Sequence, residues 1–325
     1  MKSLVLGGLA VVVLLAFGFW LYRGLEAFRY ELLDFGPTPY DAHERSRALR
    51  ERARSVTEEV GWVLADGSRQ VAYYLAPRNG AVIVYAHGSP GNALGLLRGE
   101  PTALAEAGYG ALLVDLPGYG ASEGQRTWDA RYVETVRRAV DFLSARPEVD
   151  PRRIGAFGYS NGGCVVARAA AEDERLRALV LLASYTTFAE HLHHAFRSRL
   201  PGLGYFAIAA ARWAGVPVEE LDSVSALRRM TPRPLLVVWG GRDQAIAPWM
   251  GPVLKSAVPG AEGIEYASMG HWGYAEELGG AYIGRLERFY AQSLGLPESA
   301  REPSVSRVSI DSEAGTHQDE SERRG

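Results

Sequence analysis

Residues 158–162 read Gly-Tyr-Ser-Asn-Gly, a Gly-x-Ser-x-Gly pattern with a serine at its centre. A short, largely apolar run at 153–157 precedes the pattern, and a helix-forming stretch at 165–171 follows it. This strand–turn–helix context predicts that Ser160 sits on a sharp elbow with its hydroxyl exposed. The two glycines have a steric reason, because a Cβ at either flank would clash where backbone meets backbone. The pattern therefore predicts a nucleophilic serine just past the end of a strand.

Apolar runs of strand length alternate with helix-like stretches along much of the chain. The run at 81–85 is apolar throughout, which is typical of a strand buried on both faces of a sheet. Such alternation predicts an α/β fold with a mostly parallel sheet and helices on both faces. Ligands then bind at the carboxyl ends of the strands. The predicted strands are 61–64, 70–75, 81–85, 111–114, 153–157, 178–182, 235–239 and 264–266, and the predicted helices include 96–107, 128–145, 165–171 and 274–294.

Two loops, together with the elbow, resemble those of the α/β-hydrolases. Residues 87–92 read His-Gly-Ser-Pro-Gly-Asn after one predicted strand, and residues 115–124 read Asp-Leu-Pro-Gly-Tyr-Gly-Ala-Ser-Glu-Gly after another. The resemblance extends over residues 60–294. It is closest to membrane-tethered α/β-hydrolase-domain serine hydrolases and to the serine-aminopeptidase-like branch. The resemblance implies the α/β-hydrolase fold, and it leaves the substrate open.

Three residues have the types and the chain order of a catalytic triad. A serine hydroxyl needs a base to remove its proton, and the base needs a carboxylate to orient it. In this fold the order is Ser, then Asp or Glu, then His. Asp243 and His271 each follow a predicted strand, in that order after Ser160. Glu190 is the alternative acid, but it lies inside a predicted helix. Taken singly, Asp243 fits a turn with Gly241 and His271 fits a helix cap; the shared order favours catalysis.

The expected chemistry also needs two backbone N–H donors for the oxyanion of a tetrahedral intermediate. One donor comes from the residue after the nucleophile, which is Asn161, and the other from the loop that follows an earlier strand. Pro90 has no N–H and is excluded. The resemblance to the α/β-hydrolases implies that the second donor is Ser89, directly after the His-Gly pair. Because a proline follows Ser89, its backbone is restricted to extended angles, which helps to fix the direction of its N–H.

The other polar candidates receive structural interpretations. His87 precedes the elbow and falls outside the expected order, and Asp115 resembles an acid that holds its loop in this family. His191, His193 and His194 are spaced so that two of them could share one helix face, as metal ligands do. No second ligand cluster is obvious, so a solvated helix face is predicted instead. We expect no metal and no cofactor.

Composition excludes several other classes of protein. With 325 residues and 47% hydrophobic content, the chain is expected to form one large domain plus appendages. The net charge of −3 gives no basic excess of the kind that favours nucleic acid. Cys164 is the single cysteine, so no intrachain disulfide is possible. We predict that Cys164 is a small buried packing residue.

The N-terminal segment is apolar enough to predict a membrane anchor. Residues 4–22 carry no charge, and about 20 helical residues span a bilayer core. Trp20 and Tyr22 would then lie at one interface, which amphipathic rings prefer. A cleaved signal peptide is the alternative, but the segment ends without the small residues of a cleavage site. Positive residues flank both ends, so the side of the membrane that the domain faces is left open.

These observations divide the chain into four predicted parts. They are a single-pass anchor at 1–23, a charged spacer at 24–59, an α/β-hydrolase domain at 60–295 and a disordered polar tail at 296–325. Within the domain, residues 186–231 are far longer than a typical crossover and rich in large apolar residues. A small helical cap over the site is one interpretation, and a helical pair that covers the sheet is the other.

The sequence thus predicts a membrane-anchored serine hydrolase of the carboxylesterase, lipase or thioesterase kind. Its expected substrate is a small or lipid-like ester, thioester or amide, cleaved through an acyl-enzyme. An acyltransferase and a peptidase of the same fold are alternatives, since an acyltransferase differs only in its second acceptor. A non-catalytic scaffold is disfavoured by the intact order of the triad. The oligomeric state is left open.

Overall fold

The computed structural model describes residues 15–23, 56–89, 91–97, 99–196 and 202–296. Its centre is an eight-stranded sheet in the order β1-β2-β4-β3-β5-β6-β7-β8. β2 runs antiparallel to β1 and β4, and the remaining neighbours are parallel. The strands are β1 (Glu58–Val63), β2 (Arg69–Leu75), β3 (Val82–Ala86), β4 (Gly110–Val114), β5 (Ile154–Tyr159), β6 (Leu176–Leu182), β7 (Leu235–Gly240) and β8 (Glu262–Tyr266). The predicted mostly parallel sheet is confirmed.

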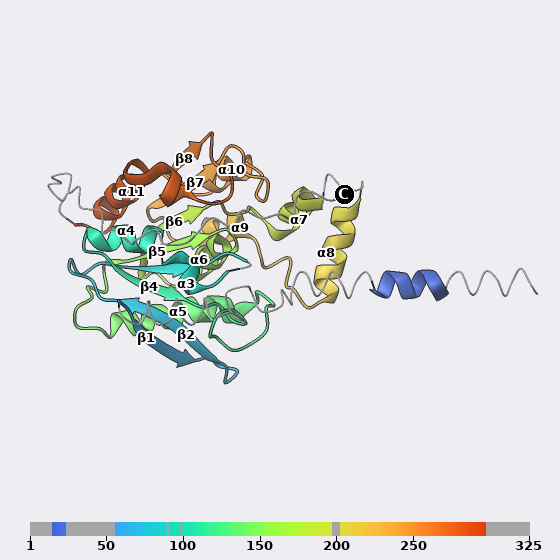
Figure 1. The fold of residues 1–325 in the computed structure, drawn as a ribbon, viewed down its shortest axis with the longest axis horizontal. Helices are drawn as coiled ribbons and strands as arrows, with labels where there is room; N and C mark the ends of the chain where they lie inside the picture. Colours follow the sequence, from blue (N-terminus) through green and yellow to red (C-terminus); the bar gives the residue numbers. More distant parts are fainter. Residues whose placement is uncertain (1–14, 24–55, 90, 98, 197–201, 297–325) are drawn as a thin grey trace, which may run out of the picture.

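Helices cover both faces of the sheet (Figure 1). Side chains alternate along each strand, so Val82 and Val84 of β3 join one core while Ile83 and Tyr85 join the other. The first core lies under α5, α6, α9 and α10, and the second lies under α3, α4 and α11. The bounds of these helices are α3 (Ala93–Leu96), α4 (Glu100–Glu106), α5 (Ala130–Ser144), α6 (Asn161–Glu172), α9 (Ser223–Arg229), α10 (Met250–Ser256) and α11 (Tyr274–Ser293).

The helix predicted at 96–107 is wrong as a single element. Two helices, α3 and α4, occupy this part of the chain, and Gly99 is the N-cap of α4. Pro101 lies in the first turn of α4. Proline has no N–H and clashes with the preceding turn, so it is tolerated where a helix begins and not in its interior. The break therefore follows from Pro101, whose effect on a helix cannot be read from the apolar pattern.

Two other helix starts differ from the prediction. The helix predicted from residue 128 begins at Ala130, because Trp128 has a φ of 54° and the carboxylate of Asp129 accepts a hydrogen bond from the N–H of Arg131. The helix after the elbow begins at Asn161 and not at residue 165. The helical register thus starts directly at the residue after the serine.

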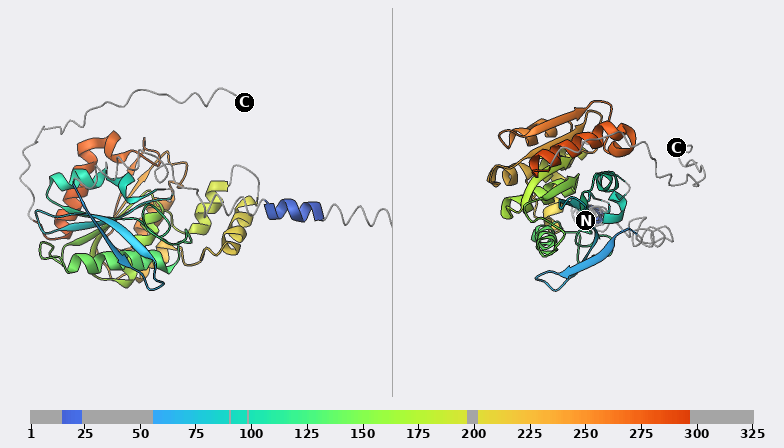
Figure 2. Two further views of the ribbon diagram at one scale, coloured as in Figure 1. Left: turned by 60° about the horizontal axis from the view of Figure 1, so that its bottom comes forward. Right: turned by 90° about the vertical axis from the view of Figure 1, so that its left-hand side faces the viewer.

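Residues 186–231 form α7 (Phe188–Phe196), α8 (Leu203–Trp213) and α9. The two ends of this excursion are joined, since the N–H of Ser223 donates to the carbonyl of Thr186 at 2.8 Å and Phe188 donates to Leu221 at 2.8 Å. α9 packs against α6. α7 and α8 pack against each other and project from the end of the domain (Figure 2). One part of the insertion therefore covers the sheet layer, and the other projects from it while its inner side chains, such as Phe188 and Ile208, remain in the first core.

Several predictions fall largely outside the described residues. Of the predicted anchor, residues 15–23 are described and helical, and residues 1–14 are not described. None of the helices in the described ranges combines the length and apolar character needed to cross a membrane. Residues 24–55 of the predicted spacer and 297–325 of the predicted tail also lie outside the description. Glu58 and Glu59, placed in the spacer, belong to β1, where they pair with Tyr74 and Tyr73.

Candidate active site

Ser160 lies on a strained turn between β5 and α6. Its φ of 53° and ψ of −117° are values that a non-glycine residue rarely adopts. A Cβ built on Gly158 would overlap the backbone of Gly162 and Gly163, and one built on Gly162 would overlap the carbonyl of Ala86. The structure therefore confirms the predicted steric reason for the two glycines.

His271 bridges Ser160 and Asp243. Its Nε2 lies 3.2 Å from Oγ of Ser160, and its Nδ1 lies 2.7 Å from Oδ2 of Asp243. All three residues are buried. Asp243 lies in the loop after β7 and His271 in the loop after β8, so both come from the carboxyl ends of parallel strands, on the side of β5 where β6 separates the elbow strand from β7. The fold thus brings together three residues that are up to 111 positions apart.

The carboxylate of Asp243 is oriented by two backbone donors. Its Oδ1 accepts from the N–H groups of Ala245 and Ile246, each at 2.8 Å. These bonds leave Oδ2 for His271. With Nδ1–H of His271 donating to this carboxylate, the lone pair of Nε2 faces the hydroxyl of Ser160. This is the tautomer that a base needs in order to accept a proton from the serine.

Tyr159 also holds the histidine in place, a contact that sequence reasoning missed. Its hydroxyl donates to the backbone carbonyl of His271 at 2.9 Å, and its ring centroid lies 5.2 Å from that of His271. Tyr274 donates to the carbonyl of Gly270 at 3.0 Å and steadies the same loop. The variable position of the Gly-x-Ser-x-Gly pattern carried no signal for this contact, because it depends on a loop more than 100 residues away.

The two predicted oxyanion donors lie at the nucleophile. Asn161 is the first residue of α6, so its N–H is among those with no acceptor inside the helix. The N–H of Ser160 itself donates to the carbonyl of Leu182 at 2.8 Å and is therefore occupied. Ser89 follows Gly88, where a Cβ would lie 3.0 Å from the Cβ of Ser160. The loop after β3 is thus pressed against the nucleophile.

The side chains of both predicted donors have other partners. Oγ of Ser89 lies 2.7 Å from the hydroxyl of Tyr119, and Oδ1 of Asn161 accepts from the hydroxyl of Tyr185 at 2.6 Å. Tyr119 also accepts from the indole N–H of Trp128 at 3.1 Å. These bonds tie Oγ of Ser89 and Oδ1 of Asn161 to the surrounding scaffold, while Nδ2 of Asn161 is buried with no partner among the described residues.

The side chains of His87 and Asp115 hydrogen-bond to the backbone of neighbouring loops. Nε2 of His87 accepts from the N–H of Leu116 at 3.1 Å, so Nδ1 carries the proton and donates to the carbonyl of Gly88 at 2.7 Å. The carboxylate of Asp115 accepts from the N–H of Ala93 at 2.7 Å and of Ala121 at 2.9 Å. His87 and Asp115 thus hold in place the loops at 87–92 and 115–124, which resemble those of the α/β-hydrolases.

The histidines of α7 do not form a metal site. No group of three or more metal-ligating side chains occurs within the described parts of the chain. The predicted solvated face is wrong for His191, whose ring stacks on Tyr185 and whose Nδ1 is buried without a partner. Burial lowers the pKa of His191 to about 4, so it is neutral at neutral pH. His193 packs edge-on against Tyr205, and Nε2 of His194 lies 3.3 Å from the carbonyl of Gln244.

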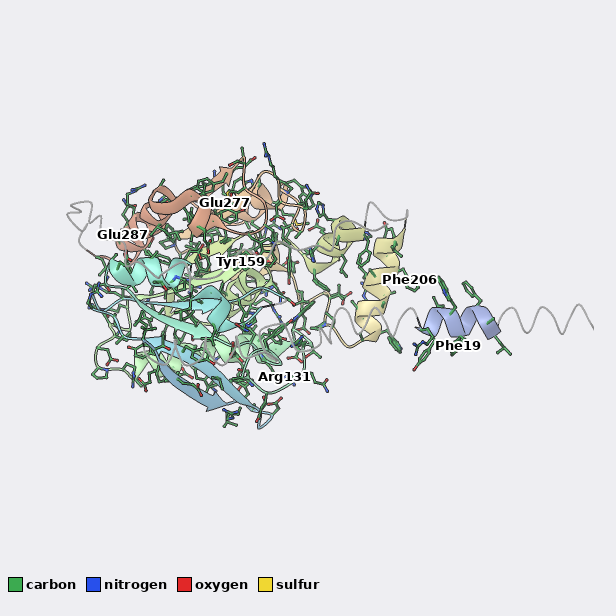
Figure 3. All side chains as sticks on the ribbon, in the orientation of Figure 1. Phe19, Arg131, Tyr159, Phe206, Glu277 and Glu287 are labelled. Atoms are coloured by element: carbon green, nitrogen blue, oxygen red, sulfur yellow. The ribbon has the colours of Figure 1, made fainter. Side chains whose placement is uncertain are left out.

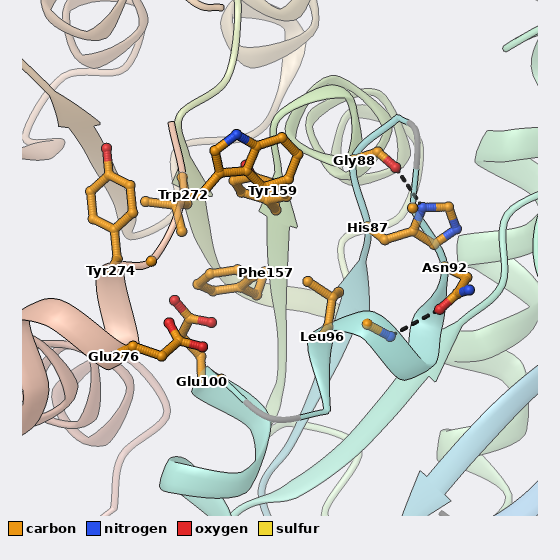
Figure 4. A pocket seen from close by; sticks show the side chains of 15 residues that line it. His87, Gly88, Asn92, Leu96, Glu100, Phe157, Tyr159, Trp272, Tyr274 and Glu276 are labelled. Atoms are coloured by element: carbon orange, nitrogen blue, oxygen red, sulfur yellow. Dashed lines mark hydrogen bonds between the residues drawn. The ribbon is translucent and has the colours of Figure 1, made fainter. Parts of the chain in front are cut away.

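A cavity of about 300 Å³ lies beside the elbow (Figure 4). Gly88 and Tyr159 form the wall that it shares with the nucleophile, and aromatic rings line much of the rest. Glu100 is a buried exception whose carboxylate accepts from the hydroxyl of Tyr282 at 2.9 Å. Burial raises the pKa of Glu100, which favours its neutral form. The lining of the cavity is therefore mainly apolar, and it includes two carboxyl groups, those of the buried Glu100 and of Glu276.

Comparison with known proteins finds a family model that matches the central part of the chain and several similar proteins. The model of the alpha/beta hydrolase fold matches residues 81–211. Protein YfhR of Escherichia coli (strain K12) is 26% identical over 228 residues, which cover 66% of this chain and 67% of YfhR. The thiohydrolase aneE of Aspergillus aculeatus is 25% identical over 231 residues, covering 69% of this chain and 72% of aneE. The polyketide transferase ATR5 of Stachybotrys chlorohalonatus is 33% identical over 131 residues, which cover 39% of this chain and 41% of ATR5.

Solved structures agree with this assignment at the level of the fold. The esterase Pf2001 of Pyrococcus furiosus superposes with a TM-score of 0.62 at 17% identity, covering 75% of this chain and 94% of the esterase. The α/β hydrolase GrgF of a Penicillium species superposes with a TM-score of 0.60 at 20% identity, covering 74% of this chain and 99% of GrgF. These structures show that the chain has the α/β-hydrolase fold, and the family model places residues 81–211 among the alpha/beta hydrolases. None of these matches assigns the chain to a membrane-tethered branch.

Proposed function

We propose that this α/β-hydrolase is a serine hydrolase that cleaves esters, thioesters or amides through an acyl-enzyme. The observation that carries the proposal is the contact of His271 with both Ser160 and Asp243. In this mechanism His271 takes the proton of the serine hydroxyl as Oγ attacks the carbonyl carbon. It then gives that proton to the leaving group, and the acyl group stays on Ser160. Water, activated by the same histidine, releases the acid and restores the serine.

The backbone N–H groups of Ser89 and Asn161 are proposed to hold the oxyanion of each tetrahedral intermediate. The position of Asn161 at the start of α6 supports its role, because the N-terminus of a helix favours negative charge. The close approach of Gly88 to Ser160 supports the loop of Ser89 as the second donor. Each such donor is typically worth about 10²–10³ in turnover.

The substrate is proposed to be a small molecule or lipid-like acyl compound whose acyl part enters the cavity beside the elbow. The aromatic rings of Phe157, Trp272 and Tyr274 in its lining support an apolar occupant. Similarity to the thiohydrolase aneE favours a thioester among the candidate bonds. Similarity to the polyketide transferase ATR5 supports acyl transfer as a second candidate function. Product analysis separates the two, since hydrolysis yields a free acid and transfer yields the acylated acceptor.

The N-terminal segment is proposed to anchor the protein in a membrane. Large apolar side chains of residues 15–23 are exposed, including Phe17, Phe19 and Trp20. Apolar surface of this kind is removed from water when a helix enters a bilayer. Extraction of membranes at alkaline pH tests the proposal: retention of the intact chain in the pellet is expected, and complete release would contradict an anchor.

A fluorophosphonate probe tests the hydrolase itself. The wild-type protein should be labelled covalently, and Ser160→Ala should lose all labelling while keeping its thermal transition. Ser256→Ala is a matched control, because Ser256 is exposed on α10 and should not affect labelling. A wild-type protein that is well folded and unlabelled would contradict the proposal.

A further inference from the structure

The outer surface of α8 carries exposed aromatic side chains. Phe206, labelled in Figure 3, is 38% exposed, and Trp213 is 53% exposed. Tyr205 is 73% exposed, with its ring in edge contact with His193 of α7. Monomeric soluble proteins rarely leave such residues clustered on one helix, and exposed apolar patches commonly mark a site of interaction. The proposed catalytic chemistry uses none of the three.

These residues share one face of the helix. With 3.6 residues per turn, Tyr205, Phe206, Ala209, Arg212 and Trp213 fall within an arc of roughly 120°. The buried residues of α8 occupy the opposite arc, which packs against α7. That packing is tight, because a Cβ on residue 204 would overlap the ring of a histidine in α7. The exposed face is therefore a stable feature of the cap and not a side left open by loose packing.

α8 is apolar on both of its faces. Its sequence, LGYFAIAAARW, has a single charged residue, Arg212, which donates to Glu219 at 2.7 Å. A helix that is hydrophobic all round is normally covered all round, either in a protein core or in a membrane. The inner face of α8 is covered by α7. The outer face of α8 therefore needs an apolar environment other than α7 to remove it from water.

We propose that the outer face of α8 docks on the surface of a lipid bilayer. Tyrosine and tryptophan have an apolar ring and a polar tip, and they concentrate at the level of the lipid headgroups. A short helix with such residues on one face lies in the plane of the interface. Arg212, on the edge of the face, is paired with Glu219, so the face itself presents no unpaired charge to the bilayer.

The size of the face favours a bilayer over a second copy of the chain. Aromatic side chains offer 150–250 Å² each, so the exposed parts of Tyr205, Phe206 and Trp213 amount to roughly 250–400 Å². A stable protein interface buries about 800 Å² on each partner.

Docking of α8 deepens the proposed function, on which it rests, by assigning the source of the substrate. α7 and α8 follow the carboxyl end of β6, so the cap stands at the edge of the sheet that carries Ser160. With α8 on the membrane, this edge faces the lipid. An acyl substrate dissolved in the bilayer could then reach the site without crossing bulk water. The inferred substrate class is a membrane-soluble ester or thioester.

The depth of α8 in a bilayer can be measured with a single probe. Cys164 is fully buried, so a cysteine placed at Ala209, an exposed residue in the centre of the face, is the accessible thiol for an environment-sensitive fluorophore. Gln292→Cys provides the matched control on α11, which lies toward the other end of the domain in Figure 1. The full chain is reconstituted into phosphatidylcholine vesicles, with and without lipid that carries a quencher in its acyl chain.

We expect quenching of at least twofold at position 209 and none at position 292. Equal exposure of both probes to water in vesicle-bound protein would overturn the docking proposal. Shielding of position 209 in detergent that increases with protein concentration would assign the face to a second copy and would overturn it as well.

Activity gives a second readout. The double variant Tyr205→Ser/Trp213→Ser should lose at least fivefold in hydrolysis of an ester embedded in vesicles and keep its hydrolysis of a short soluble ester. Equal loss on both substrates, or no loss on either, would contradict docking. Failure of the wild type to cleave the soluble ester would instead contradict the hydrolase. Failure of the full chain to float with vesicles would contradict both the anchor and the docking, with soluble activity still measuring the hydrolase.

Discussion

Nδ1 of His271 lies 2.7 Å from Oδ2 of Asp243, although 28 residues separate them in the chain. The contact is possible because β7 and β8 are parallel neighbours, so the loops at their carboxyl ends meet. The other oxygen of the carboxylate is held by two backbone N–H groups. The backbone thus fixes the carboxylate of Asp243 independently of His271, and a fixed carboxylate can orient a base.

Replacing Asp243 by Asn should lower kcat on the order of 10⁴-fold, the loss known for the same change in a serine protease. The amide would favour the wrong tautomer of His271 while leaving the shape of the loop intact. Turnover of an activated ester, measured beside the thermal transition, checks this. Near-full activity in a folded Asp243→Asn variant would show that another acid orients the histidine. Asp222→Asn is a control, because its carboxylate caps α9 and does not contact His271.

Ser89 should tolerate the loss of its side chain better than the loss of its N–H. Ser89→Ala keeps the proposed donor and loses only the contact with Tyr119, so its turnover should stay within a few-fold of wild type. Ser89→Pro removes the donor and should cost about 10²–10³ in kcat. Circular dichroism verifies that both variants fold. Equal activity of the two would place the oxyanion donor elsewhere.

Gly162 should not accept a side chain, whereas Gly280 should. Gly162→Ala sets a methyl group against the backbone carbonyl of Ala86, and a core clash of this kind costs on the order of 3 kcal/mol. The expected fall in Tm is then roughly 6–12 °C. A Cβ on Gly280, within α11, meets no described atom within 4 Å. Gly280→Ala should raise stability by about 0.5–1 kcal/mol. Unchanged stability in Gly162→Ala would contradict the close packing of the elbow.

The carboxyl of Glu100 should make stability fall as pH rises. Burial raises its pKa in the folded protein above the ordinary value of 4.5. Above pH 4.5 the unfolded chain therefore loses this proton first, and ionisation favours unfolding until the folded form also loses it. Glu100→Gln keeps an acceptor for Tyr282 without the charge. Its Tm should exceed that of wild type at pH 8, and the gain should vanish near pH 4.

The matched control for this pH dependence is Glu277→Gln, since Glu277 is an exposed carboxyl in the first turn of α11 and is not among the residues that line the cavity. Its Tm should follow that of wild type at both pH values. A Glu100→Gln variant that is less stable than wild type at pH 8 would mean that the buried carboxylate is stabilised as an ion.

Local patterns predicted the strand–elbow–helix around Ser160, the parallel sheet and the strand ends at which Asp243 and His271 lie. These features depend on steric rules and on apolar periods that act within a few residues. Apolar periodicity alone predicts a continuous helix across Pro101, because it takes no account of the missing N–H of proline. It also predicts a solvated face for His191, because the sequence of α7 does not reveal that the ring of Tyr185 stacks on that histidine.

Residue types and their order along the chain were sufficient to choose Ser160, Asp243 and His271 as candidates. The distances among them, the hydroxyl of Tyr159 that holds the loop of His271 and the cavity around Glu100 arise only when distant strands become neighbours. The exposed aromatic face of α8 is of the same kind, because an apolar sequence does not say which side its partner helix covers. Such features depend on contacts between residues far apart in the chain, and these exist only once the sheet has formed.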